Sequence, residues 1–316
     1  MEKNDCPSAL YAAVAVLAIS LFLAGCSNPG GSESPGSTWT GRTLPSTQAW
    51  SSVTYGSGVF VAVTRGPSNV AATSPDGISW TSRTLPSSLY WSSVTYGNGV
   101  FVAVAYNGDT AATSLDGITW TARSLPGGQT WLSVTYGNGV FVAVASYSPS
   151  NIAATSPDGI TWTARTLSYE YWSSVTYGNG VFVAVATGSD MDAISPDGIT
   201  WTIRSLPSIQ AWNSVTFGDG LFVAVAENSN VATTSRDGVI WTARTLPSSQ
   251  SWESVTFGNG VFVAIACYGN VAATSPDGIT WTASTLPSGQ FWDSVTYGNG
   301  VFVAVAYGSD AAATSP

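Results

Sequence analysis

The amino-acid sequence predicts an all-β fold, a seven-bladed β-propeller with four antiparallel strands in each blade. Three observations lead to this prediction: tryptophans recur at a nearly constant spacing, each repeat contains four segments with strand character, and the two ends of the repeat region complement each other. The composition agrees, because only 9% of the 316 residues are charged and 12% are aromatic. Such a profile favours strands and turns.

Two series of tryptophans divide the chain into repeat units. Successive members of a series lie 39 to 42 residues apart. The first series is Trp50, Trp91, Trp131, Trp172, Trp212, Trp252 and Trp292, and the second is Trp39, Trp80, Trp120, Trp162, Trp201, Trp241 and Trp281. Together they account for all 14 tryptophans. Self-similarity at this period is typical of propellers, and it predicts seven units.

Each unit contains four short segments with strand character. In the unit that begins at Trp91 they are residues 91–96, 100–105, 110–114 and 118–125. The Asn98-Gly99 pair between the first two suits a tight hairpin. The unbroken apolar run of residues 100–105 predicts a strand that is buried on both faces. Four antiparallel strands in about 40 residues make one propeller blade.

Each end of the repeat region lacks a part of a blade that the other end supplies. Residues 313–316 follow the third-strand pattern of the last unit, and residues 37–44 have the pattern of a fourth strand. We therefore expect residues 37–44 to form the outer strand of the last blade. Hydrogen bonds between the two ends would then close the ring, which leaves no blade face that needs a cap.

The first 25 residues are predicted to be a signal peptide. Lys3 precedes an apolar run at residues 9–24, which is short for a membrane span. The following Leu23-Ala24-Gly25-Cys26 resembles the lipobox of bacterial lipoproteins. The resemblance implies cleavage, lipidation of Cys26 and delivery to the cell envelope, at the outer membrane or cell surface. An uncleaved anchor helix is the alternative. Residues 26–36 then form a flexible tether, and residues 37–316 form the propeller domain.

The turn between the third and fourth strands carries a repeated carboxylate. Residues 74–80, Ser-Pro-Asp-Gly-Ile-Ser-Trp, resemble the Asp-box of BNR and sialidase-type propellers, shortened by one residue. The resemblance implies a folding element at the periphery of each blade. An Asp side chain accepts backbone N–H bonds within its own turn, so we expect a structural role for Asp76, Asp116, Asp158, Asp197, Asp237 and Asp277.

Composition and spacing exclude several functional classes. The net charge of −9 disfavours nucleic acid. The absence of histidine removes Ser-His and Cys-His catalysis and His-containing zinc sites, and Cys267 is the single cysteine of the repeat region. We expect no enzyme, no cofactor and no metal site. Calcium bound by Asp109, Asp190, Asp192 and Asp310, which lie in or beside loops, is a less favoured alternative.

The arginines also argue against catalysis. A sialidase needs three arginines around one carboxylate, whereas the chain repeats one arginine slot in successive fourth strands. These residues cannot converge, and we expect them to contact a neighbouring turn or blade; they are Arg42, Arg83, Arg123, Arg165, Arg204 and Arg244. Only Arg65 and Arg236 of the repeat region lie outside the pattern. A sialidase-like glycosidase is therefore the least favoured function.

Sequence variation between the units predicts where a ligand binds. The Gly-Asn-Gly and Pro-Asp-Gly turns barely vary, while the loops between second and third strands and those between units do. In a propeller these loops share the opposite side. We expect this side to bind a glycan or protein, with amide and aromatic side chains supplied by Gln48, Tyr90, Gln129, Glu170, Tyr171, Gln210, Gln250, Gln290 and Phe291.

The predicted function is thus that of a monomeric, lipid-anchored binding or adhesion module that is not an enzyme. Two alternatives stay open. The protein could be an assembly or scaffolding lipoprotein of the envelope that binds a protein partner, or the glutamines could merely cap the blades.

Overall fold

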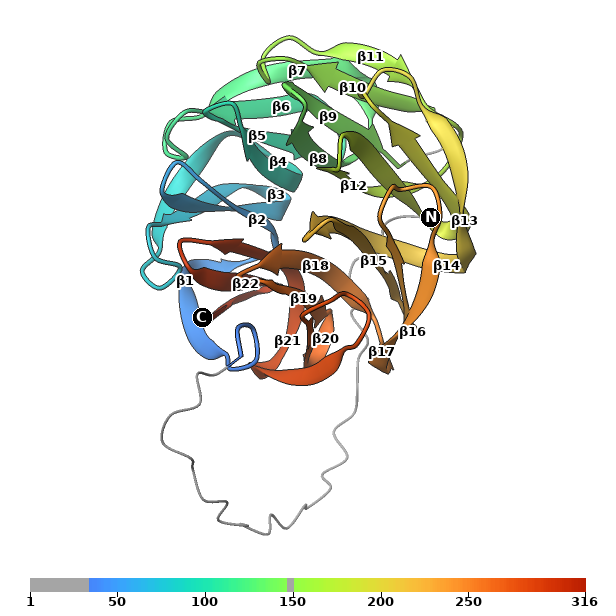
Figure 1. Ribbon diagram of the computed structural model, residues 1–316. Coiled ribbons are helices and arrows are strands. Elements are labelled where there is room, and N and C mark those ends of the chain that lie inside the picture. The colour runs from blue at the N-terminus through green and yellow to red at the C-terminus, as the bar shows by residue number, and fades with distance from the viewer. Residues whose placement is uncertain (1–33, 147–150) are drawn as a thin grey trace, which may run out of the picture.

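The computed structural model describes residues 34–146 and 151–316, and these residues form strands and turns without any helix. The predicted all-β fold is confirmed. The sheets are arranged as blades around a central axis (Figure 1), as in a propeller. The predicted signal peptide and nearly all of the predicted tether lie outside the described residues. Within the described part of the chain, nothing has the helical length and apolarity needed to cross a membrane.

The strands follow one another in a repeating order, and neighbouring strands pair antiparallel. They are β1 (Thr40–Gln48), β2 (Trp50–Gly56), β3 (Val59–Ser74), β4 (Thr81–Gly97), β5 (Val100–Ala105), β6 (Gly108–Ser114), β7 (Thr121–Gln129), β8 (Trp131–Gly137), β9 (Val140–Ala145), β10 (Ile152–Ser156), β11 (Thr163–Thr166), β12 (Trp172–Gly178), β13 (Val181–Ser195), β14 (Thr202–Gly218), β15 (Leu221–Glu227), β16 (Ser229–Ser235), β17 (Thr242–Gln250), β18 (Trp252–Gly258), β19 (Val261–Ala266), β20 (Tyr268–Ser275), β21 (Thr282–Gly298), β22 (Val301–Tyr307) and β23 (Ser309–Ser315).

Several strands are longer than the sequence predicts. β4, β14 and β21 each run without interruption from the outer strand of one blade into the inner strand of the next. The expectation of a loop between blades is wrong there, because the segment pairs with the preceding blade, for example at Gln210 with Ser189. Proline is tolerated in this segment because an outer strand has a free edge on which no backbone donor is needed.

Tight hairpins join the first and second strands of each blade. Asn98 has a φ of 49° and Gly99 one of 79°, so both residues adopt the left-handed conformation that the Asn-Gly pair favours. The strand that follows, β5, is buried over all residues except its first. Its apolar side chains therefore face both neighbouring blades, as expected from its unbroken apolar sequence.

The hydrophobic core lies between blades and not within them. In one cluster Val61 and Val63 from β3 pack with Trp91 and Phe101 from the following blade. Tryptophans of the first series are fully buried, and each cluster contains one of them. Each blade therefore depends on its neighbours for its apolar contacts.

One inter-blade hydrogen bond recurs between successive inner strands. A valine backbone N–H donates to the serine hydroxyl of the preceding blade at 3.1–3.2 Å. The pairs are Val94–Ser52, Val134–Ser93, Val175–Ser133, Val215–Ser174, Val255–Ser214, Val295–Ser254 and Val53–Ser294. The last pair joins the two ends of the repeat region.

The N-terminal strand also meets the C-terminal strand. β1 pairs antiparallel with β23, with Thr40 opposite Thr314 and Arg42 opposite Ala312. The backbone N–H of Gly36 donates to the Pro316 carbonyl at 3.1 Å. Trp39, which is 8% exposed, joins the core cluster of the last two units.

We call the side with the Asn-Gly hairpins and aspartate turns the turn side. These elements touch there, because the Asn299 amide donates to the Pro75 carbonyl at 3.2 Å. We call the opposite side, with the segments between second and third strands and those preceding each first-series tryptophan, the loop side. There the Ser68 hydroxyl donates to the Gln48 side-chain oxygen at 3.2 Å. The division into two sides follows the sequence-based expectation.

Candidate functional site

Each aspartate on the turn side is engaged by its own turn. One oxygen of Asp76 accepts the backbone N–H groups of Ile78 at 2.8 Å and Ser79 at 2.9 Å, and the Ser74 hydroxyl at 3.0 Å. The hydrogen bond from the backbone N–H of Ser79 is the main cause of the lowered pKa of Asp76, and the hydrogen bond from Ile78 lowers this pKa by less. The other five turns repeat this arrangement. These carboxylates are therefore ionised and held apart, which suits a structural role better than catalysis.

The repeated arginine makes a contact within its own blade that the sequence did not predict, and the expected contact with a neighbouring turn or blade stays a prediction. The Arg83 Nε–H donates to the Thr73 hydroxyl at 2.9 Å, across the outer pair of strands. Arg204 lacks this bond because Ile194 occupies the threonine position. The arginine at this repeated position therefore helps to hold the outer strand of its blade.

The predicted glutamines on the loop side do not converge on one another. Their backbones pair with the segment between the second and third strands, and their side chains are half-buried. The amides of Gln210, Gln250 and Gln290 donate to serine hydroxyls two residues earlier, at 3.3–3.4 Å. Gln48 accepts from Ser68, and Gln129 lies opposite Gly108. This arrangement favours the capping role that the sequence left open.

The aromatic side chains of the loop side do come together. Tyr268, Phe291 and Tyr307 lie opposite one another on β20, β21 and β22. The rings of Tyr268 and Phe291 meet edge to face with their centres 5.5 Å apart. The Arg65 guanidinium carbon lies 5.9 Å from the centre of the Tyr307 ring. A guanidinium at this distance makes a cation–π contact.

Backbone contacts link these residues to two tyrosines of the following strands. Arg65 lies opposite Tyr90 on the neighbouring strand, and the Tyr106 backbone N–H donates to the Tyr90 carbonyl at 2.6 Å. We call Tyr268, Phe291, Tyr307, Tyr90 and Tyr106 the aromatic run. Tyr90 is 42% and Phe291 37% exposed, so the run offers ring surface to solvent.

Acidic side chains lie near one end of the aromatic run. Burial raises the pKa of Tyr268, and the carboxylates of Glu227 and Glu253 raise it further. Two carboxylates therefore act on this end of the aromatic run, and they favour a neutral or basic ligand over an acidic one.

Sequence reasoning selected Tyr90 and Phe291 but missed their partners Tyr268, Tyr307 and Arg65. Tyr307 lies in a segment noted for variation, and Arg65 is one of the arginines outside the repeated slot. The signal was present, but nothing in the sequence indicated that these residues meet. Glu170 and Tyr171 are half-exposed in another blade. The Tyr171 carbonyl accepts the Thr187 backbone N–H at 2.9 Å.

The structure corrects the placement of Asp192. This residue was expected in or beside a loop, but it lies within β13 and is fully buried. One oxygen accepts the Trp241 indole N–H at 3.2 Å, and the other has no hydrogen-bond partner among the described residues. Burial raises the pKa of Asp192 to about 7. No three acidic or cysteine side chains of residues 34–146 and 151–316 are grouped as metal ligands would be.

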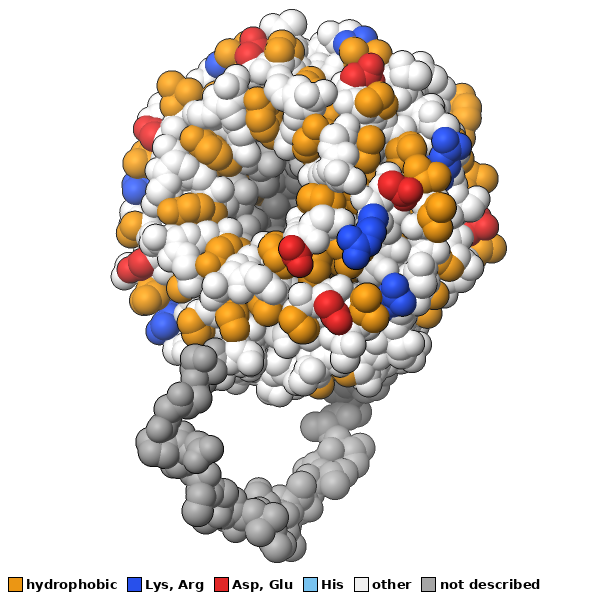
Figure 2. Space-filling view, in the orientation of Figure 1, with side chains coloured by type: hydrophobic (Ala, Val, Ile, Leu, Met, Phe, Trp, Pro, Cys, Tyr) orange, Lys and Arg blue, Asp and Glu red, His pale blue; other side chains and the backbone are white. Residues whose placement is uncertain are grey.

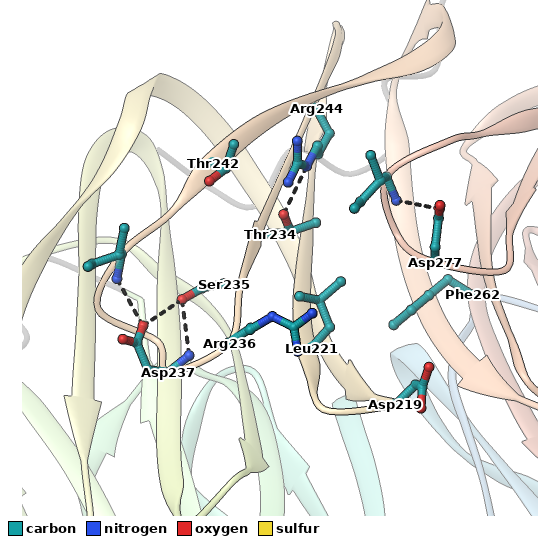
Figure 3. Close-up of a pocket in the computed structure, with 12 residues that line it drawn as sticks. Asp219, Leu221, Thr234, Ser235, Arg236, Asp237, Thr242, Arg244, Phe262 and Asp277 are labelled. Carbon is teal, nitrogen blue, oxygen red and sulfur yellow. Dashed lines mark hydrogen bonds between the residues drawn. The ribbon is translucent and has the colours of Figure 1, made fainter.

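A groove on the turn side lies between the Trp212 blade and the Trp252 blade. Its volume is about 490 Å³, and its lining contains two arginines, three aspartates and four large apolar side chains. Figure 3 shows Arg236 beside Leu221 in the middle of the groove, with Asp219 and Asp277 on one side of it and Arg244 above. In the space-filling view of Figure 2, hydrophobic side chains recur around a central hollow, and single charged side chains lie among them.

Comparison with known families and structures points to the same fold. The model of a family described as the DUF6242 β-propeller domain matches residues 36–174, less than half of the chain. No curated protein sequence matches. Virginiamycin B lyase from Staphylococcus aureus superposes with a TM-score of 0.79 at 13% identity, over 88% of this chain and 98% of that chain. Its catalytically inactive histidine-to-alanine variant with quinupristin gives 0.79 at 12%, with the same coverage.

A second similar structure is YCF48 from Cyanidioschyzon merolae. Its TM-score is 0.67 at 15% identity, over 88% of this chain and 98% of that chain. A structure of YCF48 bound to D1 peptide gives 0.67 at 14%, over 88% and 94%. At such identities the likeness concerns the fold alone, and the chain therefore contains a β-propeller domain.

Proposed function

We propose that this chain is a lipid-anchored binding module of the bacterial envelope, built as a closed propeller of seven blades, and that it is not an enzyme. The observation that carries the proposal is the aromatic run on the loop side. Exposed aromatic rings bind sugar faces and apolar peptide side chains with little loss of side-chain entropy. The run crosses blades that are far apart in the sequence, so one extended ligand could contact several of them.

The proposed closure of the ring would give a rigid site. The valine–serine bond occurs between seven successive pairs of inner strands, and the pair Val53–Ser294 joins the two ends of the repeat region. The pairing of β1 with β23 acts at the outer edge of the same blade. Arg65 and Tyr307, which form one contact of the aromatic run, also come from opposite ends of the repeats. A closed ring would hold the run in one geometry and reduce the entropy cost of binding.

The absence of suitable side chains supports a binding role without catalysis. A lyase of similar fold is described as inactive when a histidine is replaced by alanine, and this chain contains no histidine. The turn aspartates are distributed around the ring and occupied by their own backbone amides. Paired carboxylates of the glycosidase type would need to lie together.

A glycan is the first candidate ligand, and a protein partner is the second. The second is favoured by one comparison, because YCF48 is seen bound to D1 peptide. Under this alternative the chain would be an assembly or scaffolding protein, and the aromatic run would contact an extended peptide.

The experiment compares Phe291→Ala and Tyr90→Ala with Tyr169→Ala, a 66% exposed tyrosine outside the run. The mature protein is applied to a glycan array, and envelope proteins crosslinked to it are identified and titrated in purified form. Phe291→Ala and Tyr90→Ala should each lower the affinity for the tightest-binding ligand about tenfold. Tyr169→Ala should leave this affinity unchanged. Equal binding by all three variants would contradict the aromatic run as the site.

Cys26→Ala should move the protein from the membrane fraction to the soluble fraction.

A further inference from the structure

The turn side was expected to be nearly invariant, yet four of its departures lie in one groove. Four positions of the Trp212 blade differ from nearly all other units: Asp219 where asparagine or serine is usual, Leu221 for valine, Arg236 for proline or leucine, and Ile240 for threonine or serine. All four line the groove beside the Trp252 blade. Random variation would scatter such differences around the ring.

An equivalent groove serves as an internal comparison. It lies between the Trp91 and Trp131 blades, has a volume of about 330 Å³, and is lined by Val100, Leu115 and Thr119 at three of the corresponding positions. It shares the repeated arginine and both turn aspartates with the first groove. The first groove therefore differs by one added basic group, one added acidic group and larger apolar side chains.

The charges of the first groove are arranged for a ligand that carries both signs. Backbone N–H groups, chiefly that of Thr280, lower the pKa of Asp277, and the Ile240 N–H does the same for Asp237. Both are therefore anionic at neutral pH. The Arg244 Nε–H is held by the Thr234 hydroxyl at 3.0 Å, which leaves its terminal nitrogens for a ligand.

A hydrogen bond to its backbone carbonyl holds Arg236 in place, while its side chain is exposed. The Asn179 amide donates to the Arg236 carbonyl at 2.9 Å, and no hydrogen bond engages the guanidinium or the Asp219 carboxylate within the described residues. A purely anionic or purely cationic ligand would meet like charges in this groove. A ligand with an ammonium and a carboxylate group would meet the opposite charge at each end.

We propose that this groove binds a short zwitterionic peptide with apolar side chains. The carboxylate would face Arg236 and Arg244, the ammonium group would face Asp219 and Asp277, and the side chains would pack on Leu221, Phe262 and Ile240. The volume lies within the usual range of small-ligand sites. This site is separate from the aromatic run, which lies on the loop side.

The test uses the dipeptide Leu-Leu and its N-acetylated form, titrated into the mature protein by calorimetry or by NMR. Leu-Leu should bind, and Arg236→Pro and Asp219→Asn, which restore the residues usual in the repeat, should each weaken binding about fivefold. N-acetyl-Leu-Leu should bind more weakly, and Asp219→Asn should weaken it no further because the ammonium group is gone.

Leu115→Pro, the matched change in the equivalent groove, should leave Leu-Leu binding unaltered, and so should Phe291→Ala in the aromatic run. Arg236→Leu replaces Arg236→Pro if the latter lowers the melting temperature. Failure of Leu-Leu to bind up to its solubility limit would refute the proposal, as would equal binding by the original chain, Arg236→Leu and Asp219→Asn. Neither result would affect the proposed role of the aromatic run.

Discussion

The turn side and the loop side of this propeller are built by the same repeats but under different constraints. On the turn side, side chains serve the backbone: Asp76 accepts the N–H groups of its turn, and Gly97 lies against the Tyr136 ring of the next blade. On the loop side, backbone pairing continues through segments whose side chains vary freely, such as Arg65 and Tyr268. Conservation among repeats therefore marks what the fold requires, and variation marks surface on which function can develop.

The groove at Arg236 refines this comparison. It lies on the constrained side, yet Asp219 replaces an asparagine that elsewhere donates to the next blade, as Asn299 does to the Pro75 carbonyl at 3.2 Å, and an ionised carboxylate cannot donate that bond. Asp219 keeps the positive φ that asparagine has elsewhere, at 47°, so the substitution leaves the backbone unchanged. The turn side can thus vary where a side chain is not used by its own backbone.

The largest effect is expected from removing the strand that joins the two ends. Deletion of residues 37–44 removes Trp39 and Leu44, which are 8% and 2% exposed, and it leaves the edge of β23 unpaired. Loss of one large core side chain alone costs about 3–5 kcal/mol, so we expect the cooperative unfolding transition in urea to be lost or shifted strongly. An unchanged melting transition would rule out closure by this strand.

Arg42→Ser is the matched control for that deletion. It keeps β1 and introduces the residue that the chain itself has at Ser284, in the same slot. The half-buried hydrogen bond of Arg42 with the Thr314 hydroxyl, at 2.9 Å, should contribute about 1 kcal/mol. Urea unfolding followed by tryptophan fluorescence measures both variants.

The second effect concerns Asp192, which lies between the two sides where six other units have alanine. Its folded-state pKa of about 7 is above its ordinary value of 3.8, so its proton is bound more tightly in the folded protein. Its contribution to stability is therefore full below about pH 4 and is lost as the pH rises to 7. Asp192→Ala should increase the free energy of unfolding at pH 8 by up to about 4 kcal/mol.

The gain should be smaller at pH 5, where Asp192 is protonated in the folded protein. Urea unfolding at pH 5, 6, 7 and 8 measures this difference, and an equal gain at all four values would contradict the assignment. Asp310→Ala, which removes an exposed carboxylate from another blade, is the control for the loss of one acidic group.

The third and smallest effect is expected when one glycine on the turn side and one on the loop side are each replaced by alanine. A Cβ atom on Gly97 would lie 2.1 Å from the Tyr136 ring, whereas one on Gly128 would have no neighbour within 4 Å. The Tyr136 ring is itself packed on Phe141 with centres 4.7 Å apart, so it has little room to move. Gly97→Ala should destabilise the protein by about 2–3 kcal/mol. Gly128→Ala should be neutral or slightly stabilising, and similar losses at both positions would contradict the proposed difference between the sides.

Much of the fold could be predicted from the sequence because its signals are local. The Asn98-Gly99 hairpin, the aspartate turns and the apolar strand at residues 100–105 each follow from the backbone preferences of a few adjacent residues. The continuity of β4 through its proline-containing segment could not be predicted in this way. It depends on pairing with a strand of the preceding blade, which local sequence does not encode.

The sequence by itself determined the repeat, the four strands of each unit and the identity of the two sides, because periodicity and turn chemistry act over short distances. Only the tertiary structure decided which side chains meet. The contact of Arg65 with Tyr307 joins residues from opposite ends of the repeats, and the groove at Arg236 needs Asp277 from the next blade. Burial of Asp192 likewise depends on the neighbouring Trp241. Such sites arise from packing between neighbouring blades, whose relative register is decided only in the folded protein.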